Sequence, residues 1–311
     1  MEYIKFNNAM SWDDLLHRVK RLMGAMDIQA VHAASRSIIG VSNARNVVAD
    51  TVCFIEKAPG DAFEALTRAV VITNPETATV FNGSPKIIVE DPRALFIDLL
   101  NDFIAEDAFS VFSSLRDVSP SIHPEAEIHP AAIIEEGVHV GRHTRIAAGC
   151  VIKRGTHIGE QVIVRENTVI GTDGIALYRA KDGRVMRFPH IAGVIIEQGV
   201  ELGASCVISK GVMNATTIGR DCVIGNLSNL GHGVRVGAKV WMSVGCMIGG
   251  NSTIGDYSTL GLGVCLRDNL RVGNACSLGM GSVVVNDVDE GLSVLGNPAR
   301  RLPNVNAGPQ R

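Results

Sequence analysis

The chain has 311 residues, a net charge of −3 and a hydrophobic fraction of 46%. That is enough apolar material for one large or two modest domains, and the balanced charge argues against nucleic acid as a partner. No run of about 18 apolar residues occurs, so no helix is expected to span a membrane. The start lacks the apolar stretch of a secretory signal, and the seven cysteines form no C-x-x-C pair. These features predict free thiols in a reducing cytoplasm.

The first 118 residues have the character of a small α/β domain. Apolar side chains from Trp12 to Met26 fall on one face of a predicted helix. Branched runs predict strands at 51–55, 69–73 and 86–89. A second helix is expected to begin at Pro92, after Asp91 as its N-cap, and to run through Phe103.

From Ile122 to Val284 an aliphatic residue recurs at every sixth position, apart from two interruptions. Neither a helix nor an ordinary sheet has this period. Three such hexads make one triangular coil of a solenoid, so residue n lies above residue n−18, and about eight coils are expected. The predicted fold is therefore mainly β, with a parallel β-helix domain at 119–286.

The two interruptions and the C-terminal end carry separate predictions. Residues 171–194 hold no hexads and are expected to form a loop insertion that binds or covers something. The slip between Ile208 and Ile218 predicts a smaller bulge at one corner. Residues 287–311 are expected to leave the solenoid as a short C-terminal cap.

Among the nine histidines, His232 follows the inward Leu230 and lies between Gly231 and Gly233, where a ligand can approach the backbone closely. Position alone favours a surface corner histidine. His139 and His157 are 18 residues apart and are expected to stack, which with the nearby His143 raises the alternative of a zinc site. Arg142 and Arg145 lie close by, so no metal is predicted.

Several segments resemble the hexapeptide-repeat acyltransferases, and most closely the UDP-3-O-(3-hydroxyacyl)glucosamine N-acyltransferases of lipid A synthesis. The likeness rests on Gly225-Asn226-Leu227-Ser228-Asn229-Leu230-Gly231-His232, on Ile170-Gly171-Thr172-Asp173-Gly174, and on the pattern from Asp50 to Phe54. It implies a left-handed β-helix and a homotrimer with active sites between subunits. It further implies His232 as general base and the Gly250 N–H as oxyanion donor. Substrate contacts are then expected from Asn226, Asn229, Asp173 and Phe54.

Three departures from that family shape the prediction. Gly225 stands where the family has an aspartate, and Asn269 where it has a second histidine. Glu56-Lys57-Ala58-Pro59 replaces an Asn-Pro-x-Tyr motif that contacts uracil. The family's C-terminal helices, which receive acyl carrier protein, are not expected. In their place, Gly296-Asn297-Pro298-Ala299-Arg300 resembles the tail of coenzyme-A-dependent sugar acetyltransferases. This implies coenzyme contacts from Gly250, Asn297, Pro298, Arg300 and Arg301.

The predicted activity is N-acyl transfer to the amine of a nucleotide-linked amino sugar, for cell-surface polysaccharide or lipopolysaccharide. The donor is expected to be a short acyl-CoA, such as acetyl-CoA. One alternative keeps the reaction but takes a 3-hydroxyacyl group from acyl carrier protein, as in lipid A synthesis. Two others change the class: a non-catalytic solenoid scaffold and a γ-type, zinc-dependent carbonic anhydrase.

Overall fold

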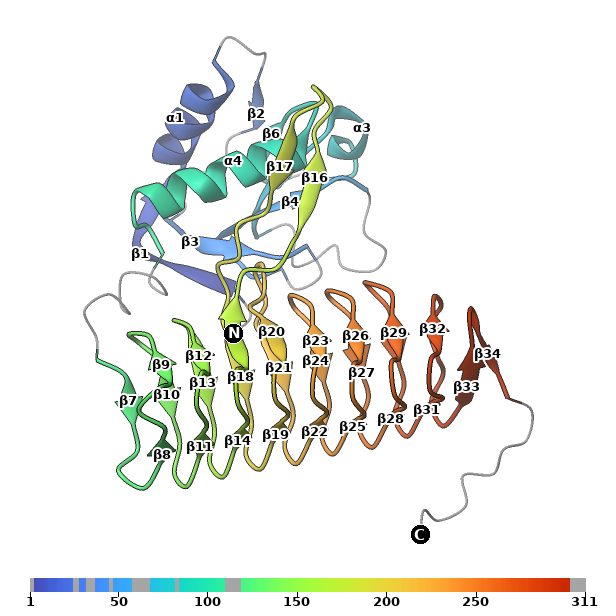
Figure 1. The fold of residues 1–311 in the computed structure, drawn as a ribbon. Coiled ribbons are helices and arrows are strands. Elements are labelled where there is room, and N and C mark those ends of the chain that lie inside the picture. The colour runs from blue at the N-terminus through green and yellow to red at the C-terminus, as the bar shows by residue number, and fades with distance from the viewer. Residues whose placement is uncertain are drawn as a thin grey trace. The chain divides into compact units, whose positions relative to one another are not determined.

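The computed structural model describes residues 3–24, 28–31, 37–44, 47–57, 68–81, 84–109 and 119–302. Residue 118, the predicted end of the first domain, and residues 303–311 of the predicted tail lie outside these ranges. The chain forms two compact units (Figure 1). The first comprises the chain up to residue 115 together with Ile175–Ile191 and Val212–Asn214, and the second is the solenoid.

The first unit contains a six-stranded sheet in the order β1-β3-β4-β5-β6-β2. Its strands are β1 (Tyr3–Ser11), β2 (Gln29–Val31), β3 (Ser37–Ser42), β4 (Thr51–Ile55), β5 (Val70–Thr73) and β6 (Lys86–Ile88). The four from β3 to β6 are parallel, and β1 and β2 close the edges antiparallel. The three predicted strands are thus confirmed as β4, β5 and β6.

Within the described residues of this unit, the helices beside the sheet are α1 (Trp12–Met23), α3 (Pro75–Ala78) and α4 (Pro92–Ala105). The Ser11 hydroxyl accepts a hydrogen bond from the Asp14 N–H, and the Asp14 carboxylate accepts one from the Ser11 N–H. This capping box fixes the start of α1. Asp91 caps α4 through the Ala94 N–H, at 3.0 Å, as predicted. In the part of the chain that the structure describes, no helix has the length and apolar character needed to cross a bilayer.

The insertion that interrupts the solenoid is a β-hairpin, where a loop was expected. Strands β16 (Leu177–Arg179) and β17 (Val185–Arg187) pair antiparallel, and the hairpin belongs to the first unit. Figure 1 shows the hairpin beside α4, and Ala180 and Met186 form a buried cluster with Ala94 and Ile97 of that helix. The predicted limits 171–194 are also too wide, because solenoid strand β15 ends at Thr172 and β18 begins at Val194.

The solenoid is a parallel β-helix with three faces, which confirms the predicted fold class. The first face contains β7 (Ser121–Ile122), β10 (His139–Val140), β13 (Thr156–Ile158), β18 (Val194–Ile196), β21 (Thr216–Ile218), β24 (Arg235–Val236), β27 (Thr253–Ile254) and β30 (Arg271–Val272). The second contains β8 (Glu127–Ile128), β11 (Arg145–Ile146), β14 (Ile163–Val164), β19 (Glu201–Leu202), β22 (Val223–Ile224), β25 (Trp241–Met242), β28 (Thr259–Leu260), β31 (Ser277–Leu278), β33 (Ser293–Gly296) and β34 (Ala299–Arg301). The third contains β9 (Ile133–Ile134), β12 (Val151–Ile152), β15 (Val169–Thr172), β20 (Val207–Ser209), β23 (Asn229–Leu230), β26 (Met247–Ile248), β29 (Cys265–Leu266) and β32 (Val283–Val284).

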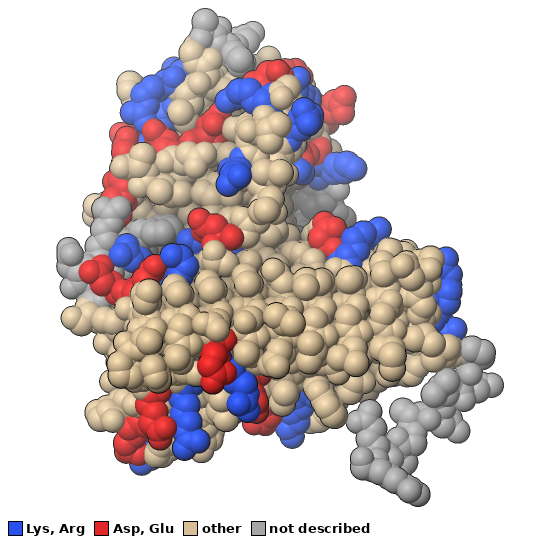
Figure 2. Space-filling view, in the orientation of Figure 1, with Lys and Arg blue, Asp and Glu red and all other residues tan. Residues whose placement is uncertain are grey.

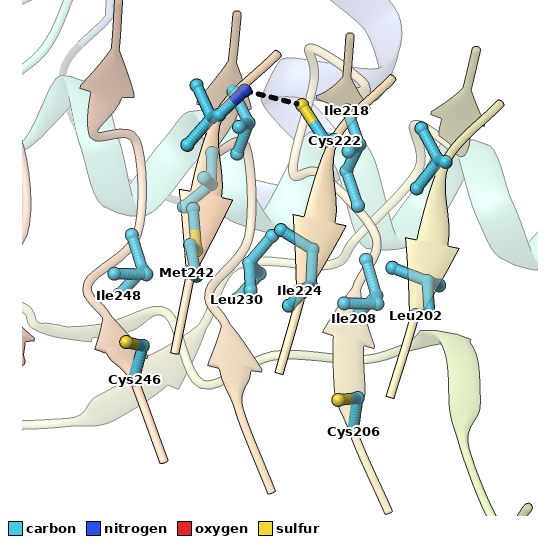
Figure 3. Packing of buried hydrophobic residues seen from close by; sticks show 14 of the residues in the cluster. Leu202, Cys206, Ile208, Ile218, Cys222, Ile224, Leu230, Met242, Cys246 and Ile248 are labelled. Atoms are coloured by element: carbon cyan, nitrogen blue, oxygen red, sulfur yellow. Dashed lines mark hydrogen bonds between the residues drawn. The ribbon is translucent and has the colours of Figure 1, made fainter. Parts of the chain in front are cut away.

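The hexad residues fill the interior of the solenoid. Leu230, Met242 and Ile248 are among those that point to the axis from different faces (Figure 3). Cysteines occupy the spaces between them, and the Cys222 Sγ accepts a hydrogen bond from the Val240 N–H, at 3.3 Å. All seven cysteines are free thiols, and only Cys265 is more than marginally exposed. A core built from branched and small side chains explains why aromatic residues are scarce in the sequence.

The C-terminal segment remains part of the solenoid for longer than predicted. Val288 bridges to Val272, and β33 pairs in parallel with β31 on the second face. The chain then reverses, and β34 pairs antiparallel with β33. The predicted start of a separate tail at residue 287 is therefore wrong. The reason is that the hexad pattern weakens after Val284 while the backbone register continues.

Candidate active site

His232 lies at a corner of the solenoid, immediately after β23 on the third face. We call this the third corner; it contains residues 231–233, 249–251 and 267–269 of three successive coils, in the register of β23, β26 and β29. The His232 side chain is partly buried. Burial lowers the pKa of His232, and the Asp268 carboxylate acts in the opposite direction. The imidazole is therefore neutral at pH 7 and able to accept a proton.

Gly250 is directly next to the imidazole, as the spacing of 18 residues predicts. The Asn251 N–H donates to the His232 carbonyl oxygen at 2.7 Å, which locks the two coils together. A Cβ atom added to Gly250 would lie 2.7 Å from His232 Nε2. The ring thus occupies the space that any side chain at Gly250 would fill. Within the described residues, the Gly250 N–H has no hydrogen-bond acceptor. An imidazole and an available N–H therefore lie side by side.

Asp173 contributes to the same corner one coil earlier. Its carboxylate pairs with Lys210 Nζ at 2.9 Å, and Lys210 is in register with His232 because Ile208 faces Leu230 across the ladder. The Lys210 side chain is 18% exposed, whereas that of Asp173 is 70% exposed. The predicted residue Asp173 is thus close to the corner, and its lysine partner is a residue that the sequence analysis missed.

The two predicted asparagines have different settings. Asn229 is exposed on β23, on the same face that leads to His232. Asn226 lies at the opposite edge of that face, and its Oδ1 accepts a hydrogen bond from the Ala204 N–H at 2.8 Å. A Cβ atom at Gly203 would collide with Asn226, so this side chain fills a corner of the coil beneath it. The structure brings Asn229 toward His232 and gives Asn226 a structural contact.

An exposed apolar row follows the edge between the second and third faces. Val244, Leu262 and Met280 occupy equivalent corner positions in successive coils and are 40%, 52% and 70% exposed. Met247, on the third face between this row and the third corner, is 46% exposed. Figure 2 shows that residues other than Lys, Arg, Asp and Glu cover most of the visible side of the solenoid. An apolar surface therefore lies on the face bounded by His232.

Phe54 belongs to the first unit, where it forms part of an aromatic cluster. Its ring is 5.0 Å from that of Phe96 and 5.9 Å from that of Phe188. The Arg93 guanidinium lies over both Phe54 and Tyr178, and it pairs with Glu56. Phe54 remains partly exposed. Such an arrangement of rings and guanidinium offers a stacking surface for a planar base.

The predicted coenzyme contacts are on the terminal hairpin. Asn297 and Pro298 form the turn between β33 and β34, and Arg300 and Arg301 are exposed on β34. This hairpin extends the second face at the last coil, whereas His232 follows the third face about three coils earlier. The structure therefore does not bring these four residues to Gly250 within one chain.

The histidine pair predicted to stack does so. The rings of His139 and His157 are 4.3 Å apart and nearly parallel. His143 instead contacts Glu125, at 3.3 Å. Among the described residues, no group of three or more His, Cys, Asp or Glu side chains is arranged to hold a metal ion. The stacked pair therefore provides no ligand set for the zinc alternative.

Sequence comparison adds a family to this geometry. Residues 119–154 match the bacterial transferase hexapeptide family, described as six repeats. Over these residues the chain is similar to that family. The register of the three faces extends that repeat from Ser121 to Val284, with the hairpin as its one long interruption.

Several proteins to which this chain is similar are named as UDP-3-O-acylglucosamine N-acyltransferases. It is 31% identical over 189 residues to UDP-3-O-acylglucosamine N-acyltransferase 1 of Legionella pneumophila (strain Paris), covering 51% of each chain. It is 29% identical over 220 residues to UDP-3-O-acylglucosamine N-acyltransferase of Methylobacillus flagellatus, covering 64% of this chain and 62% of the relative. The chain thus spans about half to two thirds of these relatives. Among solved structures, it is similar to UDP-N-acetylglucosamine acyltransferase from Campylobacter jejuni, with a TM-score of 0.47 and 19% identity over 57% of this chain and 74% of that one.

Proposed function

We propose that this protein is an N-acyltransferase that acylates the amine of a UDP-linked, 3-O-acylated glucosamine. The observation that carries the proposal is the contact between the His232 imidazole and Gly250, whose N–H has no acceptor among the described residues. The names of the sequence relatives supply the substrate class.

In the proposed reaction, the amine nitrogen attacks the carbonyl carbon of a thioester. The C–N bond forms and the C–S bond breaks, so the acyl group leaves the donor and a thiol is released. His232 takes the proton that the amine must lose and returns it to the departing sulfur. The Gly250 N–H donates to the oxyanion of the tetrahedral intermediate. Buried cysteines do not act as nucleophiles here, since burial raises the pKa of Cys246 to about 11.

The apolar row supports a long acyl chain over a short one. Val244, Leu262 and Met280 extend over two coil spacings, about 10 Å, along the face that His232 borders. An acetyl group needs no such surface, whereas a 3-hydroxyacyl chain gains about 0.8 kcal/mol for each CH₂ that it buries. We therefore take 3-hydroxyacyl carrier protein as the proposed donor and acetyl-CoA as the competing one. We also propose that three copies of the chain form a homotrimer. A measurement of the molecular mass of the protein in solution tests this.

The test compares the two donors on one acceptor and follows the product by mass spectrometry. The purified protein receives a UDP-3-O-acylglucosamine with either 3-hydroxyacyl carrier protein or acetyl-CoA. With the productive donor, His232→Ala should reduce the rate about 10²–10⁴-fold. His17→Ala, which removes an exposed histidine from α1, is the matched control and should keep the wild-type rate. An unchanged rate in His232→Ala, or no product with either donor, would overturn the proposal.

A further inference from the structure

The third corner forms a column in which residues of successive coils lie above one another. Leu230 pairs with Ile248, and Ile248 with Leu266, so His232, Gly250 and Asp268 occupy the same position in three consecutive coils. The Asn269 N–H donates to the Gly250 carbonyl oxygen at 2.9 Å, which shows that this register continues through the corner. Asp268 is therefore two coil spacings, about 10 Å, from His232 along the axis.

The imidazole extends along this column toward Asp268. The atoms closest to a Cβ atom added to Gly250 are Nε2, Cε1 and Cδ2 of His232, at 2.7, 2.8 and 3.0 Å. The ring therefore lies over the Gly250 backbone, and no side chain at position 250 separates it from the next coil. Asn269 Nδ2 donates to Asp268 Oδ2 at 2.6 Å, which restrains the carboxylate.

Other charged side chains around the corner are paired or exposed to solvent. Lys210, one coil before His232, is paired with Asp173 at 2.9 Å, so its ammonium is balanced. Arg267 precedes Asp268 in sequence and is exposed. Asp268 is an exposed carboxylate in the same column as His232, two coils further along, and no side chain at position 250 lies between the two.

We infer that Asp268 is a positioning residue for His232: its carboxylate acts across the gap at Gly250 and stabilises the imidazolium that forms when His232 accepts the amine proton. The role as base rests on the proposed function, whereas the electrostatic coupling does not. Burial and the carboxylate act on the pKa of His232 in opposite directions, and the carboxylate raises it. An aspartate in this column therefore keeps a partly buried imidazole basic enough to take a proton.

The coupling is measured directly by NMR titration of histidine side chains labelled at Cε1. The His232 signal is assigned as the one missing from His232→Gln. Two charges about 10 Å apart, at an effective dielectric constant between 20 and 80, predict that Asp268→Asn lowers the His232 pKa by about 0.3–1.2. Asp256→Asn removes an equal charge from a different corner and should leave that pKa unchanged. Salt near 1 M should narrow the difference between wild type and Asp268→Asn.

A His232 pKa that is the same in wild type and Asp268→Asn would overturn the inference. So would an equal fall in Asp256→Asn, because that result reflects net charge and not position. If Asp268→Asn unfolds, Asp268→Glu provides the second variant, since it keeps the charge and should keep the pKa. The titration needs no substrate, so it stands even if no acyl transfer is found. If acyl transfer is measured, the acid limb of the pH profile of kcat/KM should move to lower pH in Asp268→Asn, because that limb follows the pKa of His232.

Discussion

Replacing Gly250 by alanine separates the chemistry of the third corner from its stability. The new Cβ atom would lie 2.7 Å from Nε2 and 2.8 Å from Cε1 of His232, where contacts between such atoms are normally near 3.5 Å. The ring must therefore withdraw by roughly 1 Å. A displacement of that size costs about 10² in rate when it affects a positioned catalytic group. The backbone of Gly250 is not left-handed, so alanine introduces no strain in the main chain.

Gly245→Ala is the matched comparison. Gly245 lies on the opposite edge of the same face with φ +74 and open space around its Cβ position. Alanine there should cost about 1–2 kcal/mol of unfolding free energy and leave the rate unchanged. Gly250→Ala should show the reverse: a melting temperature close to wild type, a kcat lower by about 10², and a shifted His232 NMR signal. Wild-type kcat in Gly250→Ala would show that the imidazole has no fixed position to lose, and the reasoning would fail.

Two further predictions concern histidine and cysteine. Burial, and then the neighbouring His139, lower the pKa of His157. The unfolded chain therefore takes up a proton more readily, and stability should fall as pH drops below about 6.5. In His157→Gln, the urea concentration at the midpoint of unfolding should change less between pH 7 and pH 5 than in wild type. If it falls as steeply in the variant, the His139–His157 pair is not the cause. Of the seven thiols, Cys265 alone should react rapidly with a disulfide reagent at pH 8, because burial raises the pKa of Cys222 to about 11 and encloses the others. Cys265→Ser should abolish the fast phase and keep the activity; a persisting fast phase would contradict the assigned exposure.

Repetition explains how much of the fold could be predicted. A period of six specifies both the fold class and the height of each residue along the axis, so the placing of Gly250 beside His232 follows from counting. The same count places Asp268 in the column of His232. The sequence did not indicate a role for it, because an aspartate at a corner of a solenoid is common. Lys210 was missed because the slip before Ile218 changes its spacing from His232 to 22 residues. The hairpin was missed because Tyr178 and Met186 pack against α4, which is far away in the sequence, and the local sequence gives no sign of that contact.

The hairpin also has a consequence for biosynthesis. Its first strand begins about 70 residues after α4 ends, and the strands encoded between them, β7 to β15, make three coils of the solenoid. A ribosome that adds 5–20 residues per second therefore leaves the apolar side of α4 uncovered for about 4–14 s. The ribosome must therefore synthesise the first coils of the solenoid before the last segments of the first unit are available to fold. A fragment that ends at residue 118 would lack Ala180 and Met186, which pack against α4, so no single cut yields two intact units.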